Sequence, residues 1–389
     1  MNSHPPRPPR QPDRRGSVVK AVILLVAGLL STDAAAQSGP AGSVYQRGEQ
    51  STASNPPLPL ATPNPLASPV PPVAAAVAEQ GAAPAAQAGD LAPVGNPAPA
   101  GNLAPAGNLA QAGNPAPEGN PAQDAVRAER MVAAALAGLG KSESITARVR
   151  QLARVGDTVL KGGGRYLQSG TGEDQRFRFE SRLSAETEEF EVLEVGDGLF
   201  FWTYRKLGSQ PPTVTRIDIR RVRERLQRLK VPDPANASPY LGGIQRSLGL
   251  VREWFQFVSV SSAAIDDMPV WSIEGRWNGD RLASLLPAQA EAIKSVAGIS
   301  AADLPEGLPW SVRLSIGKRA LFPFRIEWLA IPGQRPVAAT TPEVVAVLEF
   351  YDVRIGEPVD ATAFVYKPAT EGLMDVSEDY CRGLRRLRP

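Results

Sequence analysis

The stretch that decides the fold is Glu189–Tyr204, which reads E-F-E-V-L-E-V-G-D-G-L-F-F-W-T-Y. Two runs rich in β-forming residues flank Gly196-Asp197-Gly198, a connection whose glycines can adopt the positive φ angles of a tight hairpin. The second run, Leu199–Tyr204, carries aromatic side chains on both faces. An antiparallel strand with one face in water should alternate apolar and polar residues. We therefore expect both faces of the sheet to be covered here, or one of them to line an apolar cavity.

Composition divides the 389-residue chain into four parts. Residues 1–36 have the features of an export signal, with basic residues, the apolar run Val18–Leu30 and a small-residue cleavage site ending at Ala36. The run is short for a bilayer span, so we expect cleavage near Ala36, a periplasmic or cell-envelope location and no transmembrane anchor. Residues 37–124, rich in Pro, Ala and Gly with hexapeptide repeats such as G-N-P-A-P-A, predict a disordered arm. Residues 125–376 form the globular domain and 377–389 a basic tail.

Residue counts exclude several function classes. The only histidine is His4, inside the predicted signal, so the mature chain has no residue for Ser-His-Asp catalysis or His-ligated metals. The full chain has 42 basic and 40 acidic residues, and residues 1–36 contain five Lys/Arg and two Asp. The mature chain therefore has 37 basic and 38 acidic residues, and this balanced charge gives no support to nucleic-acid binding. Cys381 is either a free thiol or an intermolecular bridge. Carboxylate-only chemistry stays open, for example at Asp266-Asp267, but the sequence favours a protein that is not an enzyme and predicts no metal or cofactor.

Hydrophobic periodicity in the domain predicts a sheet with a few helices. Ala125–Leu139 has an apolar stripe and is followed by Gly140, as a helix would be. Further helical patterns occupy 219–230, 240–248 and an insertion at 280–296. Strand patterns occupy 144–155, 157–168, 175–183, the opening hairpin, 213–219, 253–262, 269–278, 310–317, 321–331 and 344–353. About ten or eleven strands with short connections indicate an antiparallel sheet.

The helix expected at Ile219–Lys230 is strongly basic. Val222, Leu226 and Leu229 form its apolar stripe. Its arginines are either a contact for an acidic partner or anionic membrane surface, or a solvated face with local ion pairs. These candidates are Arg220, Arg221, Arg223, Arg225 and Arg228.

Three motifs follow one another in a characteristic order. The first is the helix followed by Ser144–Val149 (S-I-T-A-R-V). The second is F-x-F at Phe177 and Phe179, followed by V-G-D-G-L-F-F-W-T-Y. The third is F-Y-D-V-R-I-G-E-P-V-D-A-T-A-F-V-Y-K-P, from Phe350 to Pro368. Together they resemble the periplasmic outer-membrane lipoprotein carrier (LolA-like) family over roughly residues 125–376. Gly-Glu-Asp at 172–174 stands where that family has a basic-proline pair, which indicates a divergent member.

The resemblance implies an α+β fold, an incomplete antiparallel β-barrel closed by helices around an apolar cavity. It implies an envelope carrier or binder of lipoprotein acyl chains or other lipids, held by non-covalent burial, with the helix at 125–139 as a lid. The alternative is an envelope sensor or scaffold that binds a partner protein through the same fold, with the basic helix as the contact. Candidate cavity residues, which could equally be packed core, are Phe177, Phe179, Phe190, Val192, Phe200, Trp202, Phe322 and Phe324.

Overall fold

The computed structural model describes residues 120–155, 158–185, 188–295, 304–305, 308–330, 343–368 and 372–384. The predicted export signal, and the predicted disordered arm up to residue 119, lie outside these ranges. The predicted globular domain lies largely within them.

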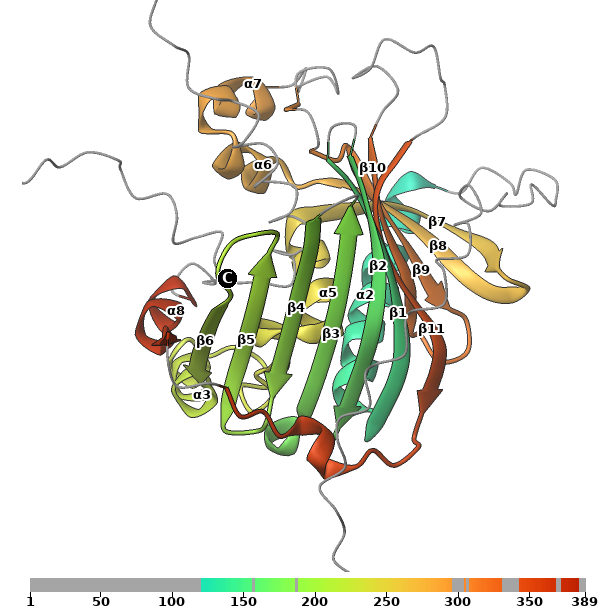
Figure 1. The fold of residues 1–389 in the computed structure, drawn as a ribbon. Coiled ribbons are helices and arrows are strands. Elements are labelled where there is room, and N and C mark those ends of the chain that lie inside the picture. Colours follow the sequence, from blue (N-terminus) through green and yellow to red (C-terminus); the bar gives the residue numbers. More distant parts are fainter. Residues whose placement is uncertain are drawn as a thin grey trace, which may run out of the picture. The chain divides into compact units, whose positions relative to one another are not determined.

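Twelve strands of the described chain form one sheet in the order β12-β6-β5-β4-β3-β2-β1-β11-β10-β9-β8-β7 (Figure 1). All neighbours are antiparallel except β12, which runs parallel to β6. The strands are β1 (Ser144–Val155), β2 (Thr158–Ser169), β3 (Arg176–Ala185), β4 (Glu188–Gly196), β5 (Phe200–Leu207), β6 (Thr213–Asp218), β7 (Phe255–Ile265), β8 (Met268–Trp277), β9 (Ser311–Gly317), β10 (Pro323–Ala330), β11 (Glu343–Ile355) and β12 (Leu373–Asp375). The predicted antiparallel sheet is confirmed, with β12 as the strand that the sequence pattern did not indicate.

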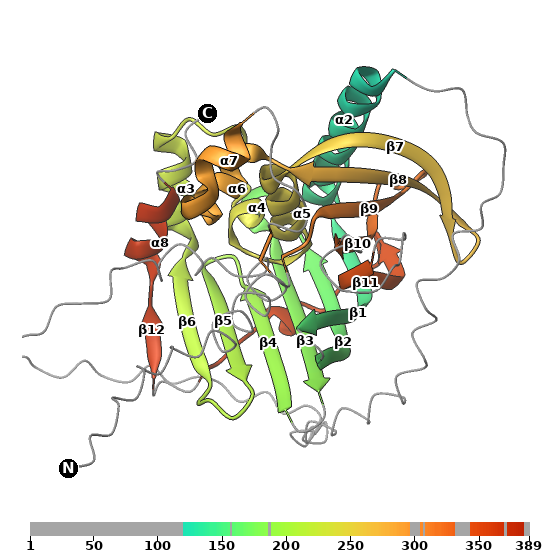
Figure 2. The same ribbon diagram turned by 90° about the horizontal axis from the view of Figure 1, so that it is seen from above.

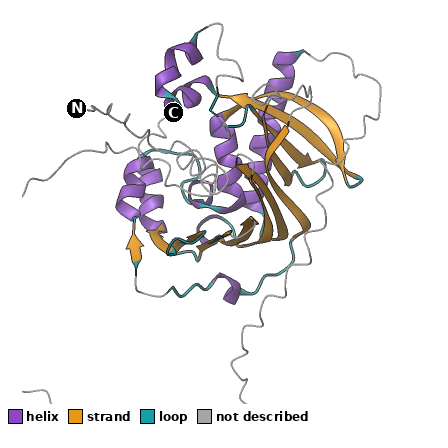
Figure 3. Cartoon of the chain, turned by 45° about the horizontal axis from the view of Figure 1, so that its top comes forward, coloured by secondary structure: helices purple, strands orange, loops and turns teal. Residues whose placement is uncertain are grey.

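Seven α-helices accompany the sheet within the described ranges. They are α2 (Pro121–Lys141), α3 (Ile219–Arg228), α4 (Ser238–Leu241), α5 (Gly243–Trp254), α6 (Gly279–Leu285), α7 (Ala290–Lys294) and α8 (Ser377–Gly383). Figures 2 and 3 show α2 and α5 on the same side of the curved sheet. We call this side the helix-covered face. The sheet is open, with β12 and β7 at its edges, so the α+β class is confirmed and closure of a barrel by helices stays a prediction.

Helix α2 begins at Pro121, four residues before the predicted start at Ala125. The Asn120 side chain caps it by accepting a hydrogen bond from the Ala122 backbone N–H at 3.1 Å. Asparagine at the cap followed by proline in the first turn is a standard helix start. The last hexapeptide repeat therefore runs into the helix, and its Asn-Pro pair is the local signal for this boundary.

The β4–β5 hairpin uses its two glycines differently. Gly198 has φ +97°, and the Asp197 carboxylate accepts hydrogen bonds from the backbone N–H groups of Leu199 and Phe200 at 2.8 and 2.7 Å. Gly196 instead belongs to β4, where a Cβ atom would lie 2.7 Å from the Phe177 ring. One glycine makes the turn and the other makes room for an aromatic side chain.

Residues 356–368, which we call the C-terminal strap, cross the face opposite the helices after β11 (Figure 1). The Arg178 guanidinium of β3 donates to the Ala363 carbonyl at 3.2 Å, and the Tyr366 ring lies 6.0 Å from the Trp202 ring. Phe364, in the short turn of the strap, is only 1% exposed. Both faces of the β4–β5 hairpin are therefore covered, one by helices and the other by the strap.

Candidate functional site: an apolar groove along α2

The predicted cavity residues divide between the two faces of the sheet. Register pairs Phe177 with Gly196, and Gly196 with Phe201, so Phe201 shares the face of Phe177. Since side chains alternate along a strand, Phe200 and Trp202 point to the opposite face, toward the strap. The buried residues on the helix-covered face are Phe177, Phe179, Phe190, Val192 and Phe322, with Phe324 half-buried in the same core.

The start of α5 packs tightly against β2–β5. A Cβ atom at Gly243, which has φ +68°, would lie 3.0 Å from Tyr166 and 3.1 Å from Phe177. A Cβ atom at Gly242 would lie 2.9 Å from Phe201. The two glycines thus bring backbone into contact with aromatic side chains, and in this structure Phe177 belongs to packed core.

A carboxylate lies at the centre of this packing. Glu194 is 0% exposed, and its Oε2 accepts a hydrogen bond from the Gly243 backbone N–H at 3.0 Å. Burial raises the pKa of Glu194 to about 7, against the lowering effects of that hydrogen bond and of the charges on Arg205 and Arg246. This residue was not a candidate from the sequence, although strand alternation places Glu194 on the same face as Phe190 and Val192.

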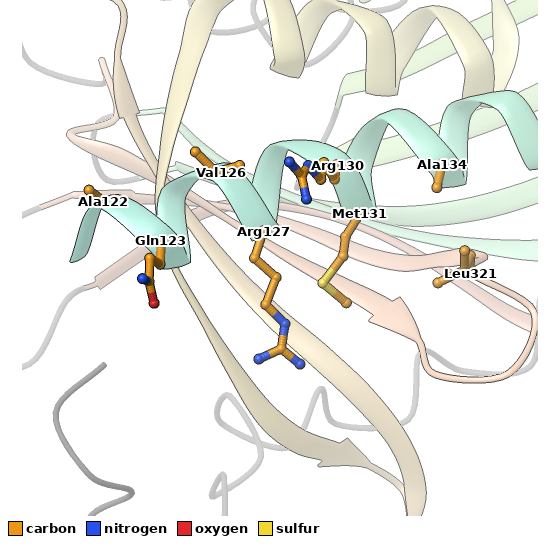
Figure 4. A pocket seen from close by; sticks show the side chains of 8 residues that line it. All are labelled: Ala122, Gln123, Val126, Arg127, Arg130, Met131, Ala134 and Leu321. Atoms are coloured by element: carbon orange, nitrogen blue, oxygen red, sulfur yellow. The ribbon is translucent and has the colours of Figure 1, made fainter. Parts of the chain in front are cut away.

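An apolar groove of about 620 Å³ opens along the N-terminal half of α2 (Figure 4). Its volume lies within the range of small-molecule binding sites. Met131, Ala134 and Leu321 supply apolar surface, while Arg127 and Arg130 bring charge. The complete lining is Ala122, Gln123, Val126, Arg127, Arg130, Met131, Ala134 and Leu321. None of these residues was a candidate from the sequence.

The groove adjoins a row of aromatic side chains in the core. Leu321 is followed by Phe322, whose ring lies 5.1 Å from Phe324 and 5.8 Å from Phe350. Phe350 in turn lies 6.4 Å from Tyr166. We call Phe324, Phe322, Phe350 and Tyr166 the aromatic row. Met131 of the groove packs against the same buried cluster, and the predicted residue Phe322 directly follows the groove residue Leu321 in the chain.

Helix α2 is held differently at its two ends. Near its C-terminal end, the buried Gln168 side chain donates to the Leu139 carbonyl at 2.8 Å. Nearer its start, the Glu129 carboxylate pairs with Arg252 of α5 at 2.6 Å, with both side chains more than 40% exposed. An exposed ion pair stabilises little. Ala128 and Val132, both 0% exposed, anchor this half of the helix in the core, and the groove lies beside it.

Most arginines of the basic helix α3 form ion pairs or hydrogen bonds with other residues of the same chain. Arg220 pairs with Asp218 at 3.2 Å, and Arg228 pairs with Glu224 at 3.7 Å. Arg223 donates to the carbonyls of Ala235 and Glu173. Among the described residues, Arg221 and Arg225 have no ion-pair partner. Val222 and Leu226 are fully buried, which confirms the predicted apolar stripe.

Comparison with known proteins concerns the fold alone. No protein-family model and no curated protein matches the sequence. Similar solved structures include a LolA superfamily protein from Nitrosomonas europaea, with 12% identity over 61% of this chain and 97% of that one, at TM-score 0.21. They include the lipoprotein LppX from Mycobacterium tuberculosis, with 12% identity over 61% and 98%, at TM-score 0.28. MucB in complex with MucA(peri) has 11% identity over 64% of this chain and 59% of that one, at TM-score 0.27.

The solved structures that resemble this chain thus include the group that the sequence motifs indicate. At these identities and TM-scores the likeness supports no functional argument, which must come from the residues of this chain. Within the described ranges, no helix is long and apolar enough to cross a membrane.

Proposed function

We propose that the protein binds an acyl chain of a lipid or lipoprotein by non-covalent burial, beginning in the groove along α2, and acts as a carrier or binder in the cell envelope. One observation carries the proposal, namely an apolar groove beside the aromatic row. Val126 at its rim is 51% exposed although it is a large apolar residue. Concave surfaces lined mainly by apolar side chains are typical of small-molecule binding sites.

The free energy gained by burying an acyl chain indicates whether the groove alone is enough for binding. Each methylene removed from water contributes about 0.8 kcal/mol. A chain with ten buried methylenes would gain about 8 kcal/mol, against an association cost of at least about 4 kcal/mol. The shallow groove alone therefore favours only weak binding. Tight binding requires deeper burial, for which the N-terminal half of α2 moves away and Phe322 and Phe324 receive the chain.

Two substitutions on the same helix test the site. Ala134 lines the groove and Ala137 is equally exposed but lies outside the lining. Ala134→Asp should weaken the binding of a fluorescent fatty acid at least tenfold, because it places a charge against the chain. Ala137→Asp is the matched control and should leave the affinity unchanged. The proposal fails if wild-type protein does not bind the probe, or if both variants behave alike.

A second candidate function is the binding of a partner protein through α3. The specific observation is that Arg221 is exposed and Arg225 half-buried, and that neither has an ion-pair partner among the described residues. A partner with acidic residues would pair with both guanidinium groups. The double variant Arg221→Glu, Arg225→Glu should then abolish cross-linking to one specific envelope protein and preserve fatty-acid binding. Unchanged cross-linking would eliminate this candidate.

A further inference from the structure

Two cations lie over one aromatic ring beside the groove. The ring belongs to Trp271 of β8, which is half-buried against the core. The guanidinium carbon of Arg127, a groove residue, is 4.7 Å from the ring centroid. The Lys318 ammonium, from the β9–β10 turn, is 4.4 Å from the same centroid. The ring quadrupole attracts each cation, but two like charges this close also repel one another.

The surrounding carboxylates leave these charges unbalanced. Arg127, Arg130 and Lys318 have no ion-pair partner among the described residues, and the Lys318 ammonium donates to the Ser262 hydroxyl. Glu129 on the same helix is paired with Arg252. Asp124, one turn before Arg127 on α2, forms no salt bridge with it. Within the described ranges, none of the three cations is therefore neutralised by an ion pair.

The arrangement of charge and apolar surface matches an amphiphile. Figure 4 shows Arg127 and Met131 extending from the same side of α2, one turn apart, with Leu321 beyond Met131. Cationic groups thus stand toward the helix start, and apolar surface continues from there toward the aromatic row.

We propose that the ligand of this groove carries an anionic headgroup, a phosphate or a carboxylate, which Arg127, Arg130 and Lys318 bind while the acyl chain lies along Met131 and Leu321. This inference rests on the proposed function and specifies its ligand class. Guanidinium and ammonium groups form charge-assisted hydrogen bonds with both anions. An anion that neutralises these charges would also reduce the repulsion between Arg127 and Lys318. A neutral headgroup would gain only the burial of its chain.

The test compares two ligands with the same chain, dodecyl phosphate and dodecyl maltoside, below their micelle concentrations, by titration calorimetry of the full chain. Dodecyl phosphate should bind at least tenfold more tightly at low salt, and the difference should shrink as salt screens the charges. Arg127→Gln with Lys318→Gln should remove this preference and keep the affinity for the maltoside. Lys141→Gln, an exposed cation at the other end of α2, is the control and should change neither.

The outcomes separate this inference from the proposed function. Equal binding of both ligands, or equal weakening of both in the double variant, would overturn the anionic headgroup and leave chain binding intact. Failure of both ligands to bind would overturn the proposed function itself. Inorganic phosphate that binds as tightly as dodecyl phosphate would show an anion site without a chain site, which also contradicts the inference. If the double variant does not fold, Lys318→Gln alone, at a surface turn, takes its place. It should reduce the preference for dodecyl phosphate over dodecyl maltoside to half or less.

Discussion

Replacing Glu194 by glutamine tests how the start of α5 is attached to the sheet. The carboxylate is fully buried and accepts the Gly243 N–H at 3.0 Å. Glutamine has the same shape and keeps an acceptor oxygen for that N–H, but it does not titrate. Any difference between the two proteins that changes with pH therefore reports the ionisation of this one group.

The sign and size of the effect follow from the pKa of Glu194. Burial raises it from 4.5 to about 7, so the folded protein binds the proton more tightly than the unfolded chain does. The free energy of unfolding is then highest below the unfolded value and falls as pH rises through the folded one. At about 1.4 kcal/mol per pH unit, the loss across this window is about 3 kcal/mol. The other carboxyl groups with shifted pKa values are lowered and titrate below the window, namely Glu180, Asp218, Asp360 and Asp375.

The assay is urea unfolding of wild-type protein, Glu194→Gln and Glu189→Gln at steps between pH 4.5 and 8. Glu189 lies exposed on the same strand and serves as the control. Wild-type protein and the control should each lose about 3 kcal/mol relative to Glu194→Gln as pH rises. Stability curves that run parallel for wild type and Glu194→Gln would refute the reasoning, because the group would then have the same pKa in both states.

Three further substitutions test the packing on each face of the hairpin. Trp202→Ala, on the strap-covered face, should lower the free energy of unfolding in urea by about 3–5 kcal/mol. The affinity of the folded protein for a fatty acid should stay constant. Weaker affinity with unchanged stability would instead place Trp202 in the ligand site. Phe364→Ala should cost a similar amount, about 3–5 kcal/mol, and speed proteolysis within residues 356–368, and an unchanged cleavage rate would show that Phe364 does not anchor the strap. Gly242→Ala should lower the free energy of unfolding by about 1–3 kcal/mol in thermal unfolding, because its Cβ would lie 2.6 Å from Glu194. The control is Gly249→Ala, whose Cβ would meet nothing closer than 3.5 Å and which should be neutral or stabilising. Equal effects of the two substitutions would contradict the tight contact at Gly242.

Local patterns in the sequence predicted most of the secondary structure. Strand β1 has the predicted limits, Ser144 and Val155, and the hairpin turns at Asp197-Gly198 as its residues require. Helix α3 was expected at Ile219–Lys230 and ends two residues earlier, at Arg228. These features depend on neighbours a few residues apart, so adjacent residues suffice to specify them.

The candidate site could not be predicted in the same way. The groove joins α2 with Leu321, some two hundred residues further along the chain, and neither segment has a distinctive pattern at that point. Glu194 was not a candidate, because nothing nearby in the sequence shows that Gly242 and Gly243 lie against it. The eight aromatic and apolar candidates stay a prediction as cavity residues, and their division between two faces required the register of β3, β4 and β5.

The sequence by itself determined that the Glu189–Tyr204 hairpin would have two apolar faces, since side chains alternate along any strand regardless of its surroundings. Only the tertiary structure decided what covers each face. Helix α5 covers one through Gly243, and the strap covers the other, where Arg178 bonds to Ala363 from 185 residues away. Burial depends on which distant segments fold back onto the strand, and that information is absent from the strand's own residues.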